Sequence, residues 1–98
     1  MTHHKVTREQ LIAIVDGDDE LIVLLLREGV IEHREDGWAA DEVDRVLVCR
    51  TLVRELEVNW AGVDIILRLR QELAVARRRI AELEAPGAAH RRDGDDRR

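Results

Sequence analysis

The sequence predicts a mainly α-helical protein with a small two-stranded β-wing and a long C-terminal helix. Apolar residues recur at helical spacing over four segments, and capping residues and glycines separate those segments. An Asp36-Gly37 pair between Ile31 and Trp38 is typical of a hairpin turn, which predicts the wing. Ninety-eight residues form one small domain at most, with a core that is marginal for a lone monomer.

The first two predicted helices are delimited by their caps. Thr7 and Gln10 match a capping box, so a helix is expected over about 8–15. The turn "DGDD" follows and places acids at the start of the next helix, where the helix dipole favours them. That second helix is expected over 19–28 and ends at Gly29, a typical residue for the position after a helix.

The second helix is too apolar for an ordinary surface helix. Leu21 to Leu26 are six consecutive apolar residues, whereas a surface helix needs one apolar stripe about 100° wide. A domain of this size has little material with which to bury one helix on every side. The sequence therefore favours exposure of part of this helix to solvent or a partner, and a central helix buried among the other three is the alternative.

The third predicted helix covers 40–56 and is followed directly by a fourth. Asn59 is a good N-cap for this fourth helix, and Val58 and Val63 fall at the two positions of a hydrophobic staple. Gly62 lies in the first turn, where the missing side chain is expected to let the third helix approach closely.

The fourth helix is expected to extend to about Glu84 and carries a heptad seam of close to three repeats. The seam consists of Ile66, Leu69, Leu73, Ala76, Ile80 and Leu83. Charges of both signs flank it, and the helix projects past anything a small domain can cover. The seam therefore predicts a homodimer contact. An antiparallel pairing is compatible with it, but heptad spacing alone does not fix the orientation.

These elements predict four segments along the chain. They are a flexible N-terminus at 1–6, a unit of three helices with a small wing at 7–58, a dimerisation helix at 59–84 and a disordered tail at 85–98. The tail mixes Pro, Gly and alternating charge without an apolar period. The first residues are not followed by an apolar signal segment, and no run approaches the roughly 20 residues of a membrane span. A soluble, cytoplasmic protein is expected.

Charge and residue types argue against several classes of function. The net charge of −5 disfavours non-specific nucleic-acid binding, which depends on Lys and Arg. The segment from Thr7 to Trp38 contains nine acidic residues and three arginines, and is therefore acidic. The segment from Ile66 to Leu83 contains five arginines and two glutamates, and is therefore basic. A single cysteine, Cys49, excludes an intramolecular disulfide and multi-cysteine metal sites. The histidines are scattered, at His3, His4, His33 and His90. No enzymatic activity, cofactor or metal is expected.

The order of these elements resembles the winged helix-turn-helix of the MerR superfamily. "REGVI", ending at Ile31, resembles the end of that family's recognition helix. "RELEVNWAGVDIILRL" is similar to a segment of heat-shock-repressor relatives and of CbpM-type chaperone modulators. Trp60, followed after one residue by glycine, favours the modulators. Two departures are Ala61, where modulators often have Pro, and Ala39 or Ala40 in place of a Ser cap, so the start of the third helix is expected to fray.

The resemblance implies a partner. CbpM-type modulators bind the J-domain of a CbpA- or DnaJ-like co-chaperone and inhibit its action with Hsp70. DNA-binding relatives carry Arg and Tyr where this chain has Val23 and Leu24, and the alignment makes Leu21, Val23 and Leu24 the exposed apolar set. An acidic surface with an apolar centre complements the basic helix of a J-domain. The expected partner-binding residues are Asp18, Asp19, Glu20, Leu21, Val23, Leu24, Arg27 and Trp60.

A second hypothesis is a DNA-binding transcriptional regulator of the MerR or heat-shock-repressor type. In that case Arg27, together with His33 and Arg34 of the wing, would contact phosphates. Binding to DNA that falls steeply with salt would distinguish this hypothesis from the first.

Overall fold

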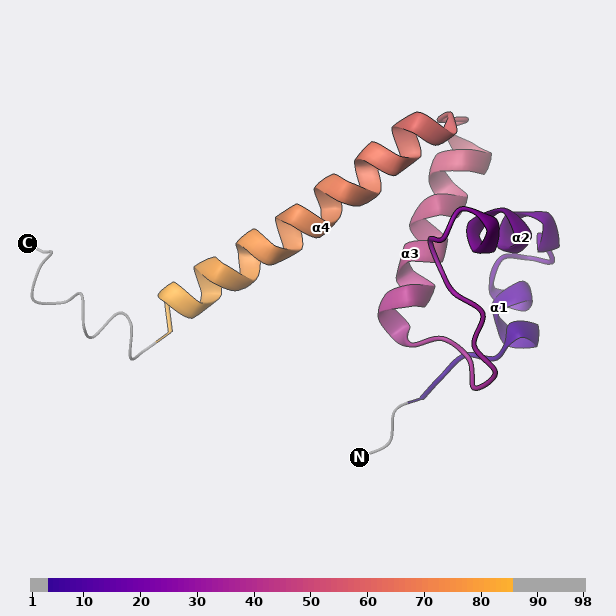
Figure 1. The fold of residues 1–98 in the computed structure, drawn as a ribbon, viewed down its shortest axis with the longest axis horizontal. Helices are drawn as coiled ribbons and strands as arrows, with labels where there is room; N and C mark the ends of the chain where they lie inside the picture. Colours follow the sequence, from indigo (N-terminus) through magenta and orange to yellow (C-terminus); the bar gives the residue numbers. More distant parts are fainter. Residues whose placement is uncertain (1–3, 86–98) are drawn as a thin grey trace, which may run out of the picture. The chain divides into compact units, whose positions relative to one another are not determined.

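A computed structural model describes residues 4–85 of the chain. Its helices are α1 (Arg8–Ile14), α2 (Asp19–Arg27), α3 (Ala40–Arg50), the π-helical turn η1 (Thr51–Glu55) and α4 (Trp60–Leu83) (Figure 1). The prediction of a mainly α-helical protein is confirmed. Most of the expected tail, together with His3, His90 and part of the expected flexible N-terminus, lies outside the described residues. Residues 4–63 and 64–85 form two separate units.

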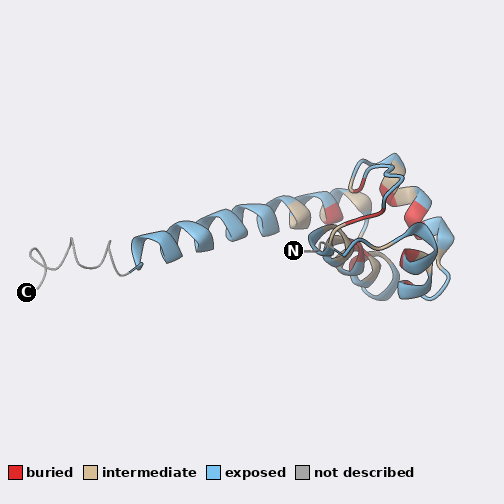
Figure 2. Cartoon of the chain, turned by 90° about the horizontal axis from the view of Figure 1, so that it is seen from below, coloured by how far each residue is buried: buried red, intermediate tan, exposed pale blue. Residues whose placement is uncertain are grey.

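The buried residues of the described chain, red in Figure 2, all belong to residues 4–63. They are Leu11, Val15, Leu21, Ile22, Leu25, Ile31, Trp38, Val46, Cys49, Leu52 and Val63. No polar or charged side chain within 4–85 is buried with them. Helix α2 supplies three of the core residues, so its burial against the other helices is a main source of the stability of this unit.

The predicted caps of α1 and α2 are confirmed. The Gln10 backbone N–H donates to Thr7 Oγ1 at 3.1 Å, and the Thr7 N–H donates to Gln10 Oε1 at 2.9 Å. Helix α1 ends one residue earlier than predicted. Asp18 caps α2 by accepting a hydrogen bond from the Leu21 N–H at 3.1 Å. Gly29 follows the helix with a left-handed φ of +79°, as expected for its position.

The predicted two-stranded wing over 31–38 is not formed, since residues 4–85 contain no strand. The glycine turn does form, with Gly37 at a φ of +95°. Trp38, however, pairs with Val6 in a single antiparallel bridge, through N–H···O bonds of 2.8 and 2.9 Å. The buried Trp38 indole N–H donates to the Glu32 carbonyl at 2.7 Å. A tryptophan anchored in the core therefore holds this loop, where strand pairing within the loop had been expected.

The third helix spans the predicted residues but changes its winding near the end. After α3, the Leu56 N–H donates to the Thr51 carbonyl, five residues back, at 2.9 Å. Glu57 then takes a left-handed φ of +55°, a role that glycine usually fills after a helix. A non-glycine residue in that region stores about 1–2 kcal/mol of backbone strain.

The N-cap predicted for α4 is confirmed, because the Gly62 N–H donates to Asn59 Oδ1 at 2.9 Å. The prediction that Gly62 allows a close approach of the third helix is wrong. A Cβ atom there would lie 2.7 Å from Val58 Cγ1, so the missing side chain makes room for Val58. Val63 is fully buried and is the last residue of the first unit. The first turn of α4 therefore belongs to the first unit, and the predicted boundary at 58/59 lies about one turn too early.

The second unit is the remainder of α4. All residues from 68 to 85 are exposed. Arg68 and Asp64 form an ion pair at 2.9 Å, one turn apart. None of the helices within residues 4–85 combines the length and apolar content that a membrane span requires.

Candidate partner-binding surface

Helix α2 divides its apolar residues between core and surface. Val23 is 47% exposed, and Leu24 and Leu26 are half-buried. Leu21 is fully buried, so its assignment to the exposed set is wrong. Leu21 lies one helical turn before Leu25 and therefore points to the same side, toward the core. The exposed part of the helix is thus narrower than the resemblance implied.

Two shallow hollows flank the ridge formed by Val23 and Arg27, which lie one turn apart on α2. The first, of about 370 Å³, is also lined by Asp19, Glu20, Leu24 and Arg54. The second, of about 290 Å³, is also lined by Arg8, Leu26 and His33. We call the exposed residues Asp19, Glu20, Val23 and Arg27, with half-buried Leu24 and Leu26, the α2 face. It has an apolar centre, acids at one end and a hollow on each side.

The three acids at the start of α2 are engaged to different degrees. Asp18 forms a two-point ion pair with Arg54, with N–O distances of 2.8 and 3.2 Å. This hydrogen bonding holds the pKa of the Asp18 carboxyl below its ordinary value. Asp19 lies 3.5 Å from the Arg8 guanidinium. Glu20 forms no ion pair with any residue in 4–85, so it is the acid best placed to meet a cationic partner.

Two arginines, one turn apart, hold the turn between α1 and α2 against the third helix. Arg54 pairs with Asp18, and Arg50 pairs with Asp16, which itself adopts a left-handed φ of +58°. Part of the acidic charge predicted for a partner therefore stabilises the fold. Residues 4–63 nevertheless hold fourteen acidic and seven basic side chains, so the unit keeps a net charge of −7.

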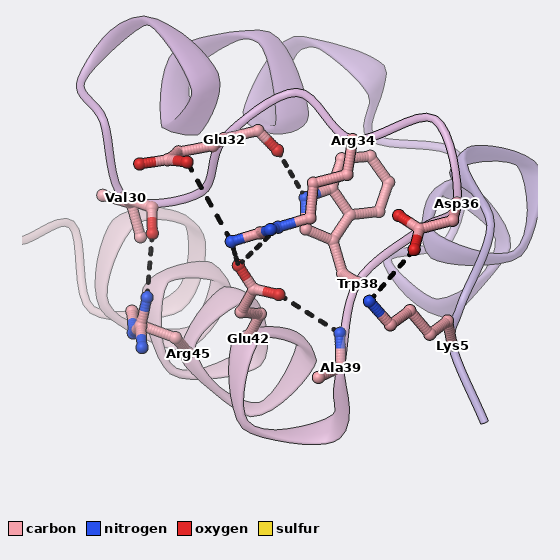
Figure 3. A network of polar contacts seen from close by, with 9 residues as sticks. All are labelled: Lys5, Val30, Glu32, Arg34, Asp36, Trp38, Ala39, Glu42 and Arg45. Atoms are coloured by element: carbon pink, nitrogen blue, oxygen red, sulfur yellow. Dashed lines mark hydrogen bonds and ion pairs between the residues drawn. The ribbon is translucent and has the colours of Figure 1, made fainter. Parts of the chain in front are cut away.

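A polar network fixes the loop between α2 and α3 (Figure 3). Glu42 accepts a hydrogen bond from Arg34 and another from the Ala39 N–H, both at 3.2 Å. The second bond ties down the start of α3, although Ala39 offers no capping side chain. Arg45 donates to the Val30 carbonyl at 3.0 Å. Arg34, a candidate phosphate contact, is thus already bound to a carboxylate.

A third hollow, of about 480 Å³, lies beside this network. Its charged lining residues are Lys5, Arg34, Arg45, Glu32, Asp41 and Glu42. Basic and acidic groups are equal in number, and Lys5 is already paired with Asp36 at 3.2 Å. That hydrogen bond lowers the pKa of the Asp36 carboxyl. The hollow lacks the excess of one charge that an anion or cation site needs.

The structure brings together five of the eight predicted partner-binding residues: Asp19, Glu20, Val23, Leu24 and Arg27. Leu21 is buried, Asp18 is paired with Arg54, and half-buried Trp60 lines neither hollow of the α2 face. Sequence reasoning missed Leu26, Arg8 and Arg54. Leu26 lies three residues after Val23, a helical spacing that could have placed it beside the ridge, whereas Arg8 and Arg54 approach only through the fold.

Most side chains of the predicted heptad seam along α4 are exposed to solvent. Ile66 is half-buried and Ala76 is exposed, while Leu69, Leu73, Ile80 and Leu83 are between 49% and 57% exposed. These values are high for large aliphatic side chains, which are among the residues most often buried in proteins.

Residues 4–85 contain no group of three or more side chains that could ligate a metal. His4 and His33 are exposed, and Cys49 is buried in the core. Comparison with known protein families, with curated proteins and with solved structures finds no match to this chain.

Proposed function

We propose that the chain is a chaperone modulator that binds the J-domain of a CbpA- or DnaJ-like co-chaperone and inhibits its action with Hsp70. The observation that carries the proposal is the α2 face, where exposed Val23 and half-buried Leu24 and Leu26 directly follow the acidic residues Asp19 and Glu20. In DNA-binding relatives implied by the resemblance, the same helix carries cationic and aromatic groups. We also propose that α1 to α3 correspond to a MerR-like helix-turn-helix, whose wing is reduced here to a loop.

The proposed binding combines apolar burial with charge attraction. Covering Val23, Leu24 and Leu26 would remove aliphatic surface from water, which contributes about 25 cal/mol per Å². The net charge of −7 on residues 4–63 would attract the basic helix of a J-domain and accelerate encounter. Glu20, with its charge uncompensated by an ion pair within 4–85, would select the orientation. No chemical step is involved, because inhibition follows from occlusion of the J-domain.

Calorimetric titration of the full chain with a purified J-domain tests the proposal directly. We expect saturable binding that weakens as salt rises from about 50 to 300 mM, because screening reduces the attraction of exposed charges. Inhibition of J-domain-stimulated ATP hydrolysis by Hsp70 should follow the same saturation. Absence of heat or inhibition at low salt, with every J-domain of the source organism, would contradict the proposed function.

A pair of variants locates the surface. Val23→Asp on the α2 face should weaken binding at least tenfold, since it places a charge at the centre of the apolar contact. Ile14→Asp introduces the same kind of charge on α1, at a side chain of comparable exposure, 37% against 47%. We expect Ile14→Asp to bind almost as the original chain does. Equal losses in both variants would point to a different surface while leaving the partner unchanged.

A DNA-binding regulator is the second candidate function. The observation that favours it is the second hollow, where Arg8, Arg27 and His33 meet beside α2. Opposing it, Arg34 is engaged by Glu42, and Arg8 lies close to Asp19. A gel shift in which affinity falls by orders of magnitude between 50 and 200 mM salt, and which Arg27→Ala weakens, would favour DNA over the J-domain.

We further propose that the chain acts as a homodimer joined through the seam of α4. The support is the row of roughly half-exposed aliphatic side chains at heptad spacing. Sedimentation analysis across a range of protein concentrations measures this directly, and a chain that stays monomeric up to several hundred micromolar would contradict it.

A further inference from the structure

We propose that the second hollow of the α2 face is a carboxylate-binding site. It takes an Asp or Glu side chain that an otherwise basic protein partner presents beside an aliphatic residue. The inference rests on the proposed function, in which a J-domain binds the α2 face, and adds a second point of recognition to that contact. It starts from the lining of the hollow, which consists of Arg8, Val23, Leu26, Arg27 and His33.

The charge of this hollow is opposite to that of its surroundings. Residues 4–63 carry a net charge of −7, yet no acidic residue of the described chain lines the second hollow, whereas two arginines and a histidine do. The third hollow differs in this respect, because its acidic and basic groups are equal in number. A concave surface lined by charges of one sign concentrates ions of the opposite sign. The second hollow therefore suits an anion.

The two arginines of the hollow are also the most weakly engaged cations of the first unit. Five of the seven Lys and Arg side chains in residues 4–63 are held closely by acceptors of the fold. They are Lys5, Arg34, Arg45 and Arg54, at 2.8 to 3.2 Å, and Arg50, through its pair with Asp16.

Arg8 and Arg27 have longer and more exposed contacts. Arg8 lies 3.5 Å from Asp19, and Arg27 lies 4.0 Å from Glu28, its neighbour in the chain. Adjacent residues of a helix do not face each other, so the second contact is a weak one. The two arginine side chains are 44% and 69% exposed, and each guanidinium carries five N–H donors. Both arginines therefore keep donors for a further acceptor.

Three separate segments supply the donors of the hollow. Arg8 begins α1, Arg27 ends α2, and His33 lies in the loop after α2. The His33 side chain forms no hydrogen bond or ion pair with residues 4–85, and even a neutral imidazole has one N–H donor. Hydrogen bonds between cationic donors and a carboxylate are stronger than those between neutral groups. The fold thus assembles donors for one carboxylate from residues that are distant in the sequence.

The rest of the lining favours a carboxylate over a phosphate. Val23 and Leu26 provide an apolar wall that suits the methylene groups of an Asp or Glu side chain. A nucleic acid would instead bring a row of phosphates close to Asp19 and Glu20, which line the first hollow on the other side of the ridge. A basic protein surface with one carboxylate meets favourable charges in both places. The two hollows together would then fix the orientation of the partner.

Neutralisation of the two arginines tests the site by the sign of its effect. Arg8→Gln and Arg27→Gln each make the first unit more negative, so general attraction of a basic partner would leave binding unchanged or tighten it. With a carboxylate in the hollow, each variant should raise the dissociation constant for a purified J-domain about three- to tenfold in calorimetric titration of the full chain. Lys5→Gln makes the same charge change outside the α2 face and should shift this constant less than twofold. Unchanged or tighter binding by both arginine variants overturns the inference and leaves the proposed function standing.

A double-mutant cycle identifies the carboxylate of the partner. Each acidic residue of the J-domain is replaced in turn by its amide, and each product is titrated against the original chain and against Arg8→Gln. One replacement should weaken binding to the original chain at least threefold and change binding to Arg8→Gln much less, because the interaction is already broken there. Additive losses for every acidic residue overturn the inference.

Two further outcomes are distinct from these. If Arg8→Gln and Arg27→Gln lose affinity for DNA in a gel shift but not for the J-domain, the hollow is a phosphate site and the inference is overturned. If the original chain binds no J-domain, the proposed function and the inference that rests on it fail together.

Discussion

The two units of this protein differ in where their apolar side chains are covered. Residues 4–63 bury eleven apolar residues and account for the whole described core, whereas residues 64–85 bury none. The second unit is nevertheless rich in aliphatic residues, with six large side chains that are about half exposed. The same kind of side chain is thus buried in the core of one unit and about half exposed in the other.

This contrast separates what holds the chain together from what it offers to other molecules. In the first unit, eleven apolar residues form an internal core, and the α2 face leaves Val23 exposed and Leu24 and Leu26 half-buried. In the second unit, the large aliphatic side chains of α4 between residues 69 and 83 are about half exposed, although most helical stability in proteins comes from the packing of an apolar face. Variants in the two units should therefore change different measurements.

The largest expected effect comes from the core. Leu25→Ala should lower the free energy of unfolding of the first unit by about 2–5 kcal/mol, because it leaves a cavity under α2. Both tryptophans belong to residues 4–63, so urea unfolding followed by tryptophan fluorescence reports on this unit. Leu73→Ala makes the same chemical change on α4 and should alter that transition by less than about 0.5 kcal/mol. Similar losses in both variants would show that the two units unfold together.

The reverse experiment targets association. Leu69→Asp places a charge in the seam of α4 and should weaken self-association about a hundredfold or more, because a buried unpaired carboxylate is strongly disfavoured. Sedimentation equilibrium measures the dissociation constant. Leu56→Asp is the matched control, since Leu56 is 62% exposed and lies outside the heptad seam. A dimer that tolerates Leu69→Asp would place the contact elsewhere.

A smaller effect concerns the acidic turn. Asp18→Asn keeps a good N-cap but removes the charge that pairs with Arg54, so stability at pH 7 should fall by about 0.5–1 kcal/mol. Because folding lowers the pKa of Asp18, this contribution is fully present above about pH 4 and is lost as pH falls through the folded value. Urea unfolding of both proteins at pH 7 and pH 2 should therefore show a difference only at pH 7. A difference of equal size at both pH values would rule out the ion pair as its cause.

The smallest predicted effect is an increase in the free energy of unfolding. Glu57 adopts a left-handed conformation after η1, so Glu57→Gly should raise the unfolding free energy by about 0.5–1 kcal/mol. Glu55→Gly, two residues earlier inside the helical turn, should instead lower it by a similar amount. Thermal unfolding of the two variants gives the comparison, and a loss in both would show that the strain at Glu57 is relieved by its surroundings.

Local signals in the sequence predicted the helices well. The Thr7 and Gln10 capping box, the Asn59 cap and Gly29 all act within four residues, so the chain itself carries the information. The prediction of the wing was wrong because Trp38 pairs with Val6, thirty-two residues away along the chain. A hairpin-turn motif gives information only about pairing between segments that are adjacent in the sequence. The winding of η1 and the left-handed Glu57 have no sequence signal that helical periodicity detects.

The candidate site was predicted less well, for a related reason. Leu21 was assigned to the surface from a family resemblance, although its spacing from Leu25 places both on the buried side of α2. Asp18 is one of the residues predicted to contact a partner, but its carboxylate forms an ion pair with Arg54 at the end of the third helix. Sequence spacing identifies the face of a helix, whereas ion pairs between distant segments require the fold.

The separation of buried and exposed residues along α2 has a consequence for natural sequence variation. Leu21, Ile22 and Leu25 face the core, and Val23 and Arg27 face outward one turn apart. Substitutions at 23 and 27 can therefore accumulate without loss of the fold, while those at 21, 22 and 25 are limited to aliphatic residues of similar volume. Under the proposal that the α2 face binds another protein, residues 23 and 27 are expected to vary when that protein changes, while the three core positions stay aliphatic.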